Sequence, residues 1–181
     1  MATTPLRERT RQEILRRAME LFTEKGYTAT SLQDIATAVG CSKATVLYHF
    51  NGKPAVAAAV LEPAAKLVAD LVAEAAQLPP AEAQARLITD FTELAVRFRG
   101  LLDVLNDVVP TMDQLPEFHG MVEVGTALTR LLAGTDDPGE IALAGYAIQG
   151  LLGECRAPVQ RADEELRDLA VTAMRRLLIT P

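Results

Sequence analysis

The sequence predicts an all-α protein of about nine helices, in which a three-helix head (residues 1–53) precedes a helical-bundle body (residues 54–181). Three observations support this fold class. Apolar residues make up 49% of the chain and are mostly Ala, Leu and Val, of which Ala and Leu favour helices. They recur with helical spacing, and no alternating strand pattern is present. Glycine and proline residues divide the chain into segments of ordinary helix length.

The first two helices of the head are defined by an apolar stripe and a capping pattern. The stripe consists of Ile14, Leu15, Ala18, Leu21 and Phe22. Gly26 follows it, where a helix stop belongs. Either Thr30 with Gln33 or Ser31 with Asp34 forms a capping box, which predicts that a second helix begins here. The inner face of that helix consists of Leu32, Ile35, Ala36 and Val39, and Gly40 ends it.

A third helix follows after only two residues. Ser42 is expected to cap it, and Val46 and Phe50, four residues apart, are expected to point inward together. Asn51-Gly52 breaks the helix. A helix, a glycine stop, a short turn and a second capped helix form a helix-turn-helix pattern, whose second helix presents its first residues to the major groove of DNA.

The body reads as helix throughout. A long helix is expected from about Pro54, and Pro63 is expected to kink or interrupt it. Further helices are expected at about 81–99, 101–108, 116–133, 138–155 and 162–179. These are separated by Pro79-Pro80, Pro110, Gly134 with Pro138, and Pro158.

The charge of the chain is divided unevenly between head and body. Residues 1–53 hold eight basic and five acidic residues, a net charge of +3, so the remaining residues must carry −9 of the total of −6. A basic head on an acidic body indicates a polyanionic partner for the head alone.

The location of the protein is expected to be the cytoplasm. The two cysteines, Cys41 and Cys155, lie far apart without metal-ligand spacing, which is typical of free thiols. The N-terminal sequence does not read as a signal peptide, and no apolar stretch suits a transmembrane helix. No membrane partner, cofactor or metal is therefore expected.

A small helical enzyme is the competing interpretation. His49 stands beside a tyrosine, and a histidine can act as a general base. However, no acid, cysteine or serine is placed to orient it, and the second histidine of the chain, His119, lies far away in the sequence. A metal site fails for the same lack of ligands. We therefore do not expect an enzyme.

The segment GYTATSLQDIATAVGCSKATVLYHFNGKPAV resembles the N-terminal domain of the TetR family of transcriptional regulators, and the resemblance covers about residues 7 to 60. It implies a sequence-specific DNA-binding regulator, most often a repressor, with helix-turn-helix residues 31–50. By resemblance, Thr30 and Ser31 cap the second helix and contact phosphate. Lys43, Ala44 and Tyr48 lie nearest the bases, and Thr45, His49 and Lys53 contact the DNA backbone. The helix cap Ser42 completes this surface.

Two residues depart from the family pattern. Cys41 replaces the usual valine and is expected to be a small filler. Leu47 replaces a frequent tyrosine, so a phosphate contact is lost or Leu47 contacts a thymine methyl group.

The resemblance also implies a homodimer on a palindromic operator and a small-molecule effector that releases the repressor. The expected dimer interface comprises Ala142, Gly145, Gln149, Gly153, Leu166, Ala170, Ala173 and Leu177. The expected effector pocket comprises Phe91, Leu94, Phe98, Leu102, Met112, Phe118, Met121, Val122 and Tyr146. Packing within one chain is the alternative for the first set. A filled core, and hence a DNA-binding module without an effector, is the alternative for the second.

Overall fold

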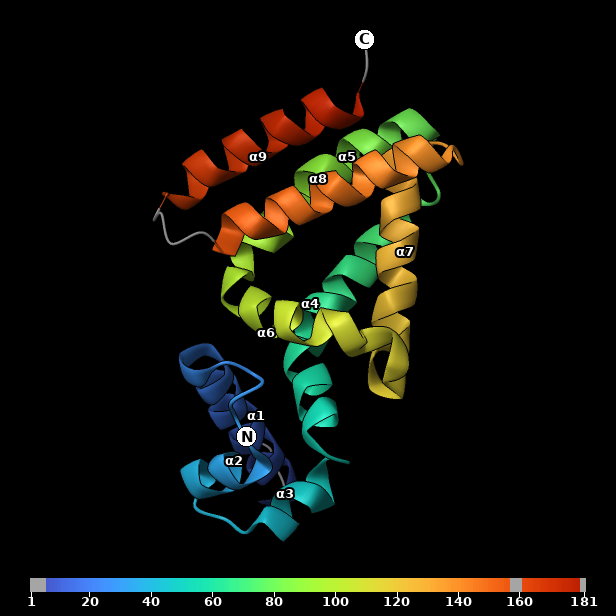
Figure 1. Ribbon diagram of the computed structural model, residues 1–181. Helices are drawn as coiled ribbons and strands as arrows, with labels where there is room; N and C mark the ends of the chain where they lie inside the picture. Colours follow the sequence, from blue (N-terminus) through green and yellow to red (C-terminus); the bar gives the residue numbers. More distant parts are fainter. Residues whose placement is uncertain (1–5, 157–160, 180–181) are drawn as a thin grey trace, which may run out of the picture. The chain divides into compact units, whose positions relative to one another are not determined.

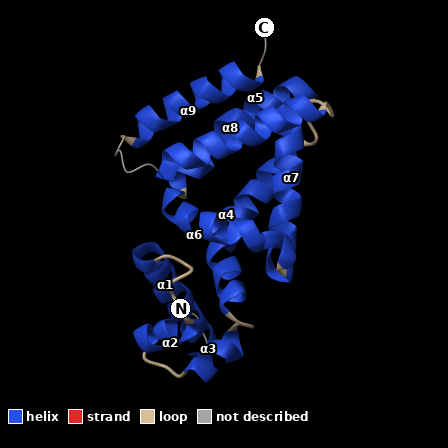
Figure 2. Ribbon diagram, viewed as in Figure 1, coloured by secondary structure: helices blue, strands red, loops and turns tan. Residues whose placement is uncertain are grey.

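The computed structural model describes residues 6–156 and 161–179, and these residues form helices joined by short loops (Figures 1 and 2). Nine α-helices occur among them, which confirms the predicted fold class. Their bounds are α1 (Leu6–Lys25), α2 (Leu32–Val39), α3 (Lys43–His49), α4 (Lys53–Ala75), α5 (Pro80–Arg97), α6 (Leu102–Val108), α7 (His119–Ala133), α8 (Pro138–Arg156) and α9 (Asp163–Leu178). Short 3-10 helices are η1 (Arg99–Leu101), η2 (Val109–Gln114) and η3 (Pro116–Phe118).

The predicted spans of the body agree with these helices to within one or two residues, with one exception. The span expected at 116–133 begins as η3, and the α-helix proper starts only at His119. Pro116 stands at the first position of the short helix, where its fixed backbone angle and missing N–H are tolerated. Pro158 lies outside the described residues.

The chain forms two compact units, which do not follow the order of the sequence. The first unit contains residues 1–63 and 103–119, and the second contains residues 64–102 and 120–181. α4 belongs to both, and the division falls at Pro63. The helix runs through Pro63 without interruption, although the proline has no N–H to donate to the preceding turn.

The core of the first unit joins the first three helices. Its buried side chains include Ile14, Ala18, Phe22, Ile35, Ala36, Val46 and Phe50. The predicted inward direction of Val46 and Phe50 is confirmed, since their exposed fractions are 0% and 6%. A helix of seven residues such as α3 is not stable in isolation. These two anchors therefore hold α3 against α1 and α2.

Gly40 ends α2 and directs the chain into α3. Its φ angle of 77° lies in the left-handed region, which costs glycine little and other residues more. The N–H groups of Gly40 and Cys41 donate to carbonyl oxygens of the last helical turn, at 3.1 and 2.9 Å. This double closure is the usual glycine helix stop. Cys41 beside it is half-buried, and burial raises the pKa of its thiol, which suits the predicted role of a filler.

The second unit is built on the packing of α5, α8 and α9 (Figure 1). Its buried residues include Leu87, Ile88, Val96, Leu151, Leu166 and Met174. Gln84 ties the ends of three helices together, because its Nε2 donates to the carbonyl oxygens of Leu132 at 2.7 Å and Leu178 at 3.3 Å. Among the described residues, no helix is both long and apolar enough to cross a membrane.

Candidate nucleic-acid interface

The N-terminus of α2 is capped by Ser31. Ser31 Oγ accepts from the N–H of Asp34 at 3.1 Å, and Asp34 Oδ2 accepts from the N–H of Ser31 at 2.8 Å. This reciprocal pair is a capping box, and the hydrogen bonds from Ser31 lower the pKa of the Asp34 carboxyl. The alternative box of Thr30 with Gln33 is wrong.

Thr30 differs from the other predicted interface residues because it is buried, with an exposed fraction of 1%. Its hydroxyl donates to the carbonyl oxygen of Gly26 at 2.8 Å and lies 3.3 Å from that of Leu21. The residue therefore ties the end of α1 to the start of α2. Of the two residues expected to cap α2, the cap is Ser31, which is exposed.

The N-terminus of α3 is organised by Ser42. Its Oγ accepts from the N–H of Thr45 at 3.1 Å and lies 2.9 Å from the Thr45 hydroxyl. A serine cap satisfies one of the free N–H groups of the first turn and fixes the point where the helix starts. The side chains after it are thereby presented in a defined direction, as the sequence predicted.

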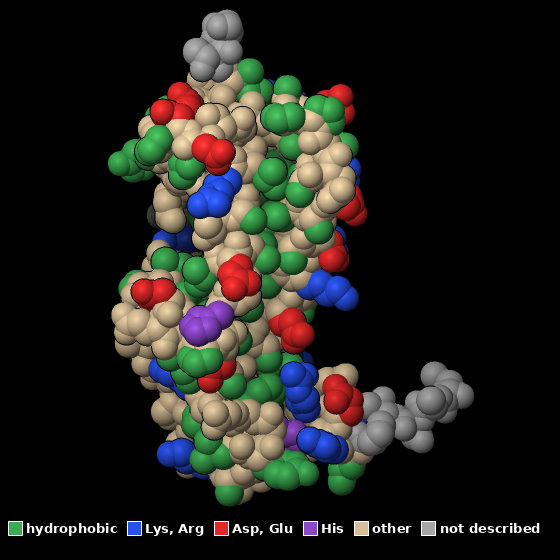
Figure 3. All heavy atoms as spheres, turned by 90° about the vertical axis from the view of Figure 1, so that its right-hand side faces the viewer, with side chains coloured by type: hydrophobic (Ala, Val, Ile, Leu, Met, Phe, Trp, Pro, Cys, Tyr) green, Lys and Arg blue, Asp and Glu red, His purple; other side chains and the backbone are tan. Residues whose placement is uncertain are grey.

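The outer face of α3 carries polar, basic and apolar side chains together. Lys43, Ala44, Leu47 and Tyr48 are exposed, with fractions of 47% for Leu47 and 69% for Tyr48. The ring of His49 stands edge-on to that of Tyr48, with ring centres 5.2 Å apart. On a surface such a mixture suits DNA, because bases offer methyl groups and hydrogen-bonding edges side by side. Figure 3 shows Lys and Arg side chains in blue beside hydrophobic side chains in green on one face of the molecule.

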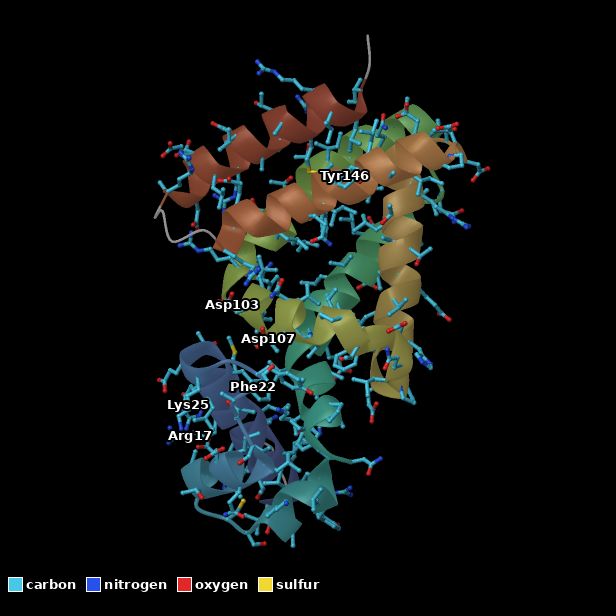
Figure 4. All side chains as sticks on the ribbon, viewed as in Figure 1. Arg17, Phe22, Lys25, Asp103, Asp107 and Tyr146 are labelled. Atoms are coloured by element: carbon cyan, nitrogen blue, oxygen red, sulfur yellow. The ribbon has the colours of Figure 1, made fainter. Side chains whose placement is uncertain are left out.

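The turn between α1 and α2 is held from two sides, by Lys53 of α4 and Asp107 of α6. Nζ of Lys53 donates to the carbonyl oxygens of Tyr27 at 2.9 Å and Thr28 at 3.3 Å, and lies 4.2 Å from the centre of the Tyr27 ring. Asp107 Oδ2 accepts from the N–H of Tyr27 at 3.1 Å (Figure 4). Burial lowers the pKa of Lys53, and the nearby Asp107 opposes that shift. Lys53 therefore has a structural role that the sequence did not predict, which leaves one N–H for a ligand.

The residues of the predicted effector pocket belong to different units. Met112 and Phe118 lie in the first unit, and the other seven lie in the second. Four of the nine side chains are buried: Phe91, Leu102, Met112 and Phe118. Val122 and Tyr146 are exposed, at 37% and 71%. Leu94, Phe98 and Met121 are half-buried.

A hollow of about 200 Å³ lies between α8 and α9 within the second unit. It is lined by Tyr146, Ala147, Gly150, Leu151, Glu154, Leu166, Leu169, Ala170, Ala173, Met174 and Leu177. Four of these were expected at a dimer interface: Leu166, Ala170, Ala173 and Leu177. Leu166 and Ala170 are buried between the two helices, whereas Leu177 and Leu169 are each 43% exposed.

The α8 residues expected at the dimer interface lie on the surface. Ala142, Gln149 and Gly153 are exposed, and Gly145 is half-buried. A Cβ atom added at Gly145, Gly150 or Gly153 meets no atom within 4 Å. These three glycines of α8 are thus not required for close packing within the chain. Ala147, Leu151 and Glu154 were not predicted from the sequence, because assigning them to this hollow requires the relative placement of two helices.

The two histidines do not lie in a group of possible metal ligands. In the described ranges, no group of three or more His, Cys, Asp or Glu side chains is placed to hold a metal ion. His119 starts α7 and is exposed.

In comparisons with known proteins, the first unit is similar to the helix-turn-helix domains of transcriptional regulators. Residues 14–60 match the profile of "Bacterial regulatory proteins, tetR family", so this part of the chain is similar to members of that family. The match includes α2 and α3 with both caps. The family and the named relatives are transcriptional regulators, not enzymes.

Curated relatives match a short part of the chain, and two of them are transcriptional regulators by name. The "Biofilm operon icaADBC HTH-type negative transcriptional regulator IcaR" of Staphylococcus aureus is 44% identical over 46 residues, which is 25% of this chain and 25% of that protein. The "HTH-type transcriptional regulator SrpR" of Pseudomonas putida is 43% identical over 54 residues, 30% of this chain and 25% of the relative. The chain thus spans about a quarter of the length of the curated relatives that it matches.

Solved structures are similar over nearly the whole chain. The TetR family regulator PfmR from Thermus thermophilus has a TM-score of 0.68 at 21% identity, and the similarity covers 91% of this chain and 96% of that one. The ketosteroid transcriptional regulator KstR2 of Mycobacterium tuberculosis has a TM-score of 0.68 at 15% identity, covering 93% and 92%. At these identities the similarity shows the fold of the body and leaves its ligands open.

Proposed function

We propose that this protein is a dimeric, sequence-specific DNA-binding regulator of transcription that represses its target and is released by a small-molecule effector. One observation carries the DNA-binding part. α3 begins at a serine cap after a glycine stop and exposes Lys43, Ala44, Leu47 and Tyr48 within the region that matches the family profile. The named curated relatives are regulators of transcription, and IcaR is a negative one.

Each exposed residue of α3 suits a different contact. Lys43 donates to a guanine edge or a phosphate, and Ala44 is small enough to let the helix approach the bases. Tyr48 and Leu47 supply apolar contact with thymine methyl groups. In this proposal the DNA phosphates are contacted by Ser31, Ser42, Thr45, His49 and the remaining N–H group of Lys53. Thr30 is excluded because it is buried.

The experiment begins with selection of sequences from a random duplex pool by the purified chain. We expect one palindromic sequence whose half-sites are separated by about 34–36 Å or a multiple of that spacing. Affinity for it should fall with salt, with a slope of roughly 0.9 per phosphate contacted. Lys43→Ala should lower both affinity and slope. If the chain enriches no sequence and its binding is insensitive to salt, DNA recognition is refuted.

The dimer is proposed to form through α8 and α9. The outer surface of these two helices carries the exposed Tyr146 and, next to it, the hollow, whose lining includes the small residues Gly150 and Ala173. A two-fold interface needs a surface that is complementary to itself, and a protruding ring beside a hollow meets that need. Leu169 and Leu177 add exposed apolar surface to the same face.

Effector control is proposed to act through α4. This helix runs from the DNA-binding unit into the second unit, and Lys53 at its start binds the α1–α2 turn directly. An effector bound within the second unit, near Phe98 and Met121, would shift α4 and change the distance between the two copies of Lys43. Such a ligand acts only through its different affinity for the two states, typically about 1–3 kcal/mol.

This coupling is tested by screening small molecules for release of the selected duplex. A flexible Gly-Ser insert after Lys53 should abolish release while DNA binding persists. If no compound releases the wild-type chain, the protein is better described as a DNA-binding module without an effector. The free thiols Cys41 and Cys155 support a cytoplasmic location for either form.

A further inference from the structure

The start of α1 lies against the end of α3, although 41 residues separate them in the sequence. The guanidinium carbon of Arg7 lies 5.5 Å from the centre of the Tyr48 ring. One turn later, that of Arg11 lies 5.1 Å from the centre of the Phe50 ring. Tyr48 is 69% exposed, so Arg7 sits at the surface on the outer edge of the proposed DNA-reading helix.

The positive charges of α1 are compensated unevenly along the helix. Arg16 pairs with Glu13 at 2.5 Å and with Glu20 at 2.7 Å, and Arg17 pairs with the same two acids at 3.1 and 3.0 Å. In the part of the chain that the structure describes, no ion pair joins Arg7 to a carboxylate. The neutralised arginines thus occupy the middle of α1, and uncompensated charge gathers at its beginning, beside α3.

The position of its guanidinium carbon over the Tyr48 ring prepares Arg7 for a ligand. A guanidinium over an aromatic face is attracted by the ring, while its five N–H groups point outward in its own plane. None of them donates a hydrogen bond within the described residues. A planar fork of free donors on an exposed edge matches the oxygen atoms of a phosphate.

We propose that Arg7 is a further DNA-contacting residue, which donates to a backbone phosphate next to the bases read by α3 and orients the Tyr48 ring for that reading. This inference rests on the proposed DNA-binding function. It extends the interface beyond the helix-turn-helix, since Arg7 precedes the residues 14–60 that match the family profile. In this arrangement Arg7 fixes the orientation of the Tyr48 ring, and the ring contacts the bases.

The test compares three full-length variants on two duplexes, the sequence selected by the wild-type chain and a scrambled version. Arg7→Ala should weaken binding to the selected duplex roughly tenfold, as expected for one charge-assisted contact. It should also reduce the salt slope by about 0.9. Arg7→Lys should keep the slope, but should reduce the preference for the selected duplex, because an ammonium does not stack as a plane on Tyr48.

Arg16→Ala is the matched control. It removes the same charge from the same helix, but from a side chain already paired with two acids. We expect its affinity and slope to equal those of the wild type. Thermal unfolding should be unchanged for Arg7→Ala, which separates a lost contact from a damaged fold.

The outcomes distinguish this inference from the function on which it rests. If the wild-type chain selects no sequence, the proposed function fails and the role of Arg7 fails with it. If the wild-type chain selects a sequence but Arg7→Ala binds it with unchanged affinity and slope, only the role of Arg7 is overturned. Full preference in Arg7→Lys would overturn the orientation of Tyr48 by stacking.

Discussion

Two tyrosines of this protein are almost equally exposed, Tyr48 on α3 at 69% and Tyr146 on α8 at 71%, yet their surroundings are opposite. Tyr48 stands beside the guanidinium of Arg7 and the ring of His49. Tyr146, labelled in Figure 4, borders a hollow whose lining is almost entirely apolar, with Glu154 the charged member.

The comparison teaches that exposure by itself does not identify a partner. An aromatic ring beside a cation suits a polyanion, since the cation binds a phosphate and the ring contacts bases. An aromatic ring beside an apolar hollow suits a second apolar surface, because contact removes both from water. The neighbours of each tyrosine therefore support our proposals that Tyr48 contacts DNA and that Tyr146 contacts a second copy of the chain.

The largest effect is expected from filling the hollow. At Gly150 an added Cβ atom meets nothing within 4 Å in the single chain, so we expect Gly150→Leu to be tolerated in the monomer and to clash with a partner. Overpacking costs about 1–3 kcal/mol per contact, and a symmetric dimer meets the clash twice. We expect a monomer by sedimentation. Gly125→Leu on α7, where a Cβ also meets nothing, is the control and should leave the dimer intact. An unaffected Gly150→Leu dimer would move the interface elsewhere.

The second prediction exchanges the roles of the two tyrosines. Tyr146→Ala should weaken dimerisation by about 2 kcal/mol or more, the size typical of an aromatic hot spot. It should do so without altering the thermal unfolding of the monomer. Tyr48→Ala should leave dimerisation unchanged and reduce affinity for the selected duplex more than for the scrambled one. Sedimentation and DNA titration should be measured on both variants. We expect Tyr146→Ala to change sedimentation and Tyr48→Ala to change DNA affinity directly. If each variant changed both measurements equally, the proposed difference between the two tyrosines would be refuted.

The third prediction concerns the joint between α1 and α6. Asp107→Ala removes the acceptor of the Tyr27 N–H, and an unsatisfied buried group costs about 1–3 kcal/mol. Because Tyr27 is partly buried, we expect a loss at the lower end of this range in urea unfolding, together with weaker DNA binding. The exposed Asp113 in η2 supplies the control, since Asp113→Ala should change neither. Normal stability of Asp107→Ala would show that this hydrogen bond does not hold the turn.

The smallest effect is expected at the cap of α2. Ser31→Ala should destabilise the protein by about 1 kcal/mol at neutral pH. The pKa of Asp34 is lowered in the folded state, so its contribution is present above its unfolded pKa, about 3.9, and is lost as pH falls through the folded value. The difference between Ser31→Ala and the wild type should therefore shrink in urea unfolding at pH below 4. A difference independent of pH would contradict the capping box.

The head was more predictable than the body for a physical reason. Helix caps involve residues only about three positions apart, so Ser42 and Gly40 mark helix ends that can be recognised in the sequence. The anchors Val46 and Phe50 also follow from spacing within one helix. The sequence did not decide whether Ser31 or Thr30 caps α2, because each is followed three residues later by a possible capping-box partner. The burial of Thr30 in the folded protein decides between them.

The structural role of Lys53 could not be inferred from spacing, since the carbonyl oxygens that it binds lie 26 and 25 residues away. The same holds for the grouping of residues 103–119 with the head and for the neighbours of Arg7. The nine residues proposed for the effector pocket were chosen for apolar character, and apolar character alone does not distinguish a ligand wall from a filled core.

The sequence by itself determined the helical fold class, the helix ends of the head and the face of α3 that carries Lys43, Leu47 and Tyr48, because helical periodicity and capping are local properties of the chain. Only the tertiary structure decided what lies beside those helices. It placed Arg7 against Tyr48, turned Lys53 toward the α1–α2 turn and opened a hollow next to Tyr146. Contacts between distant segments depend on how several helices pack together, and no short stretch of sequence specifies that packing.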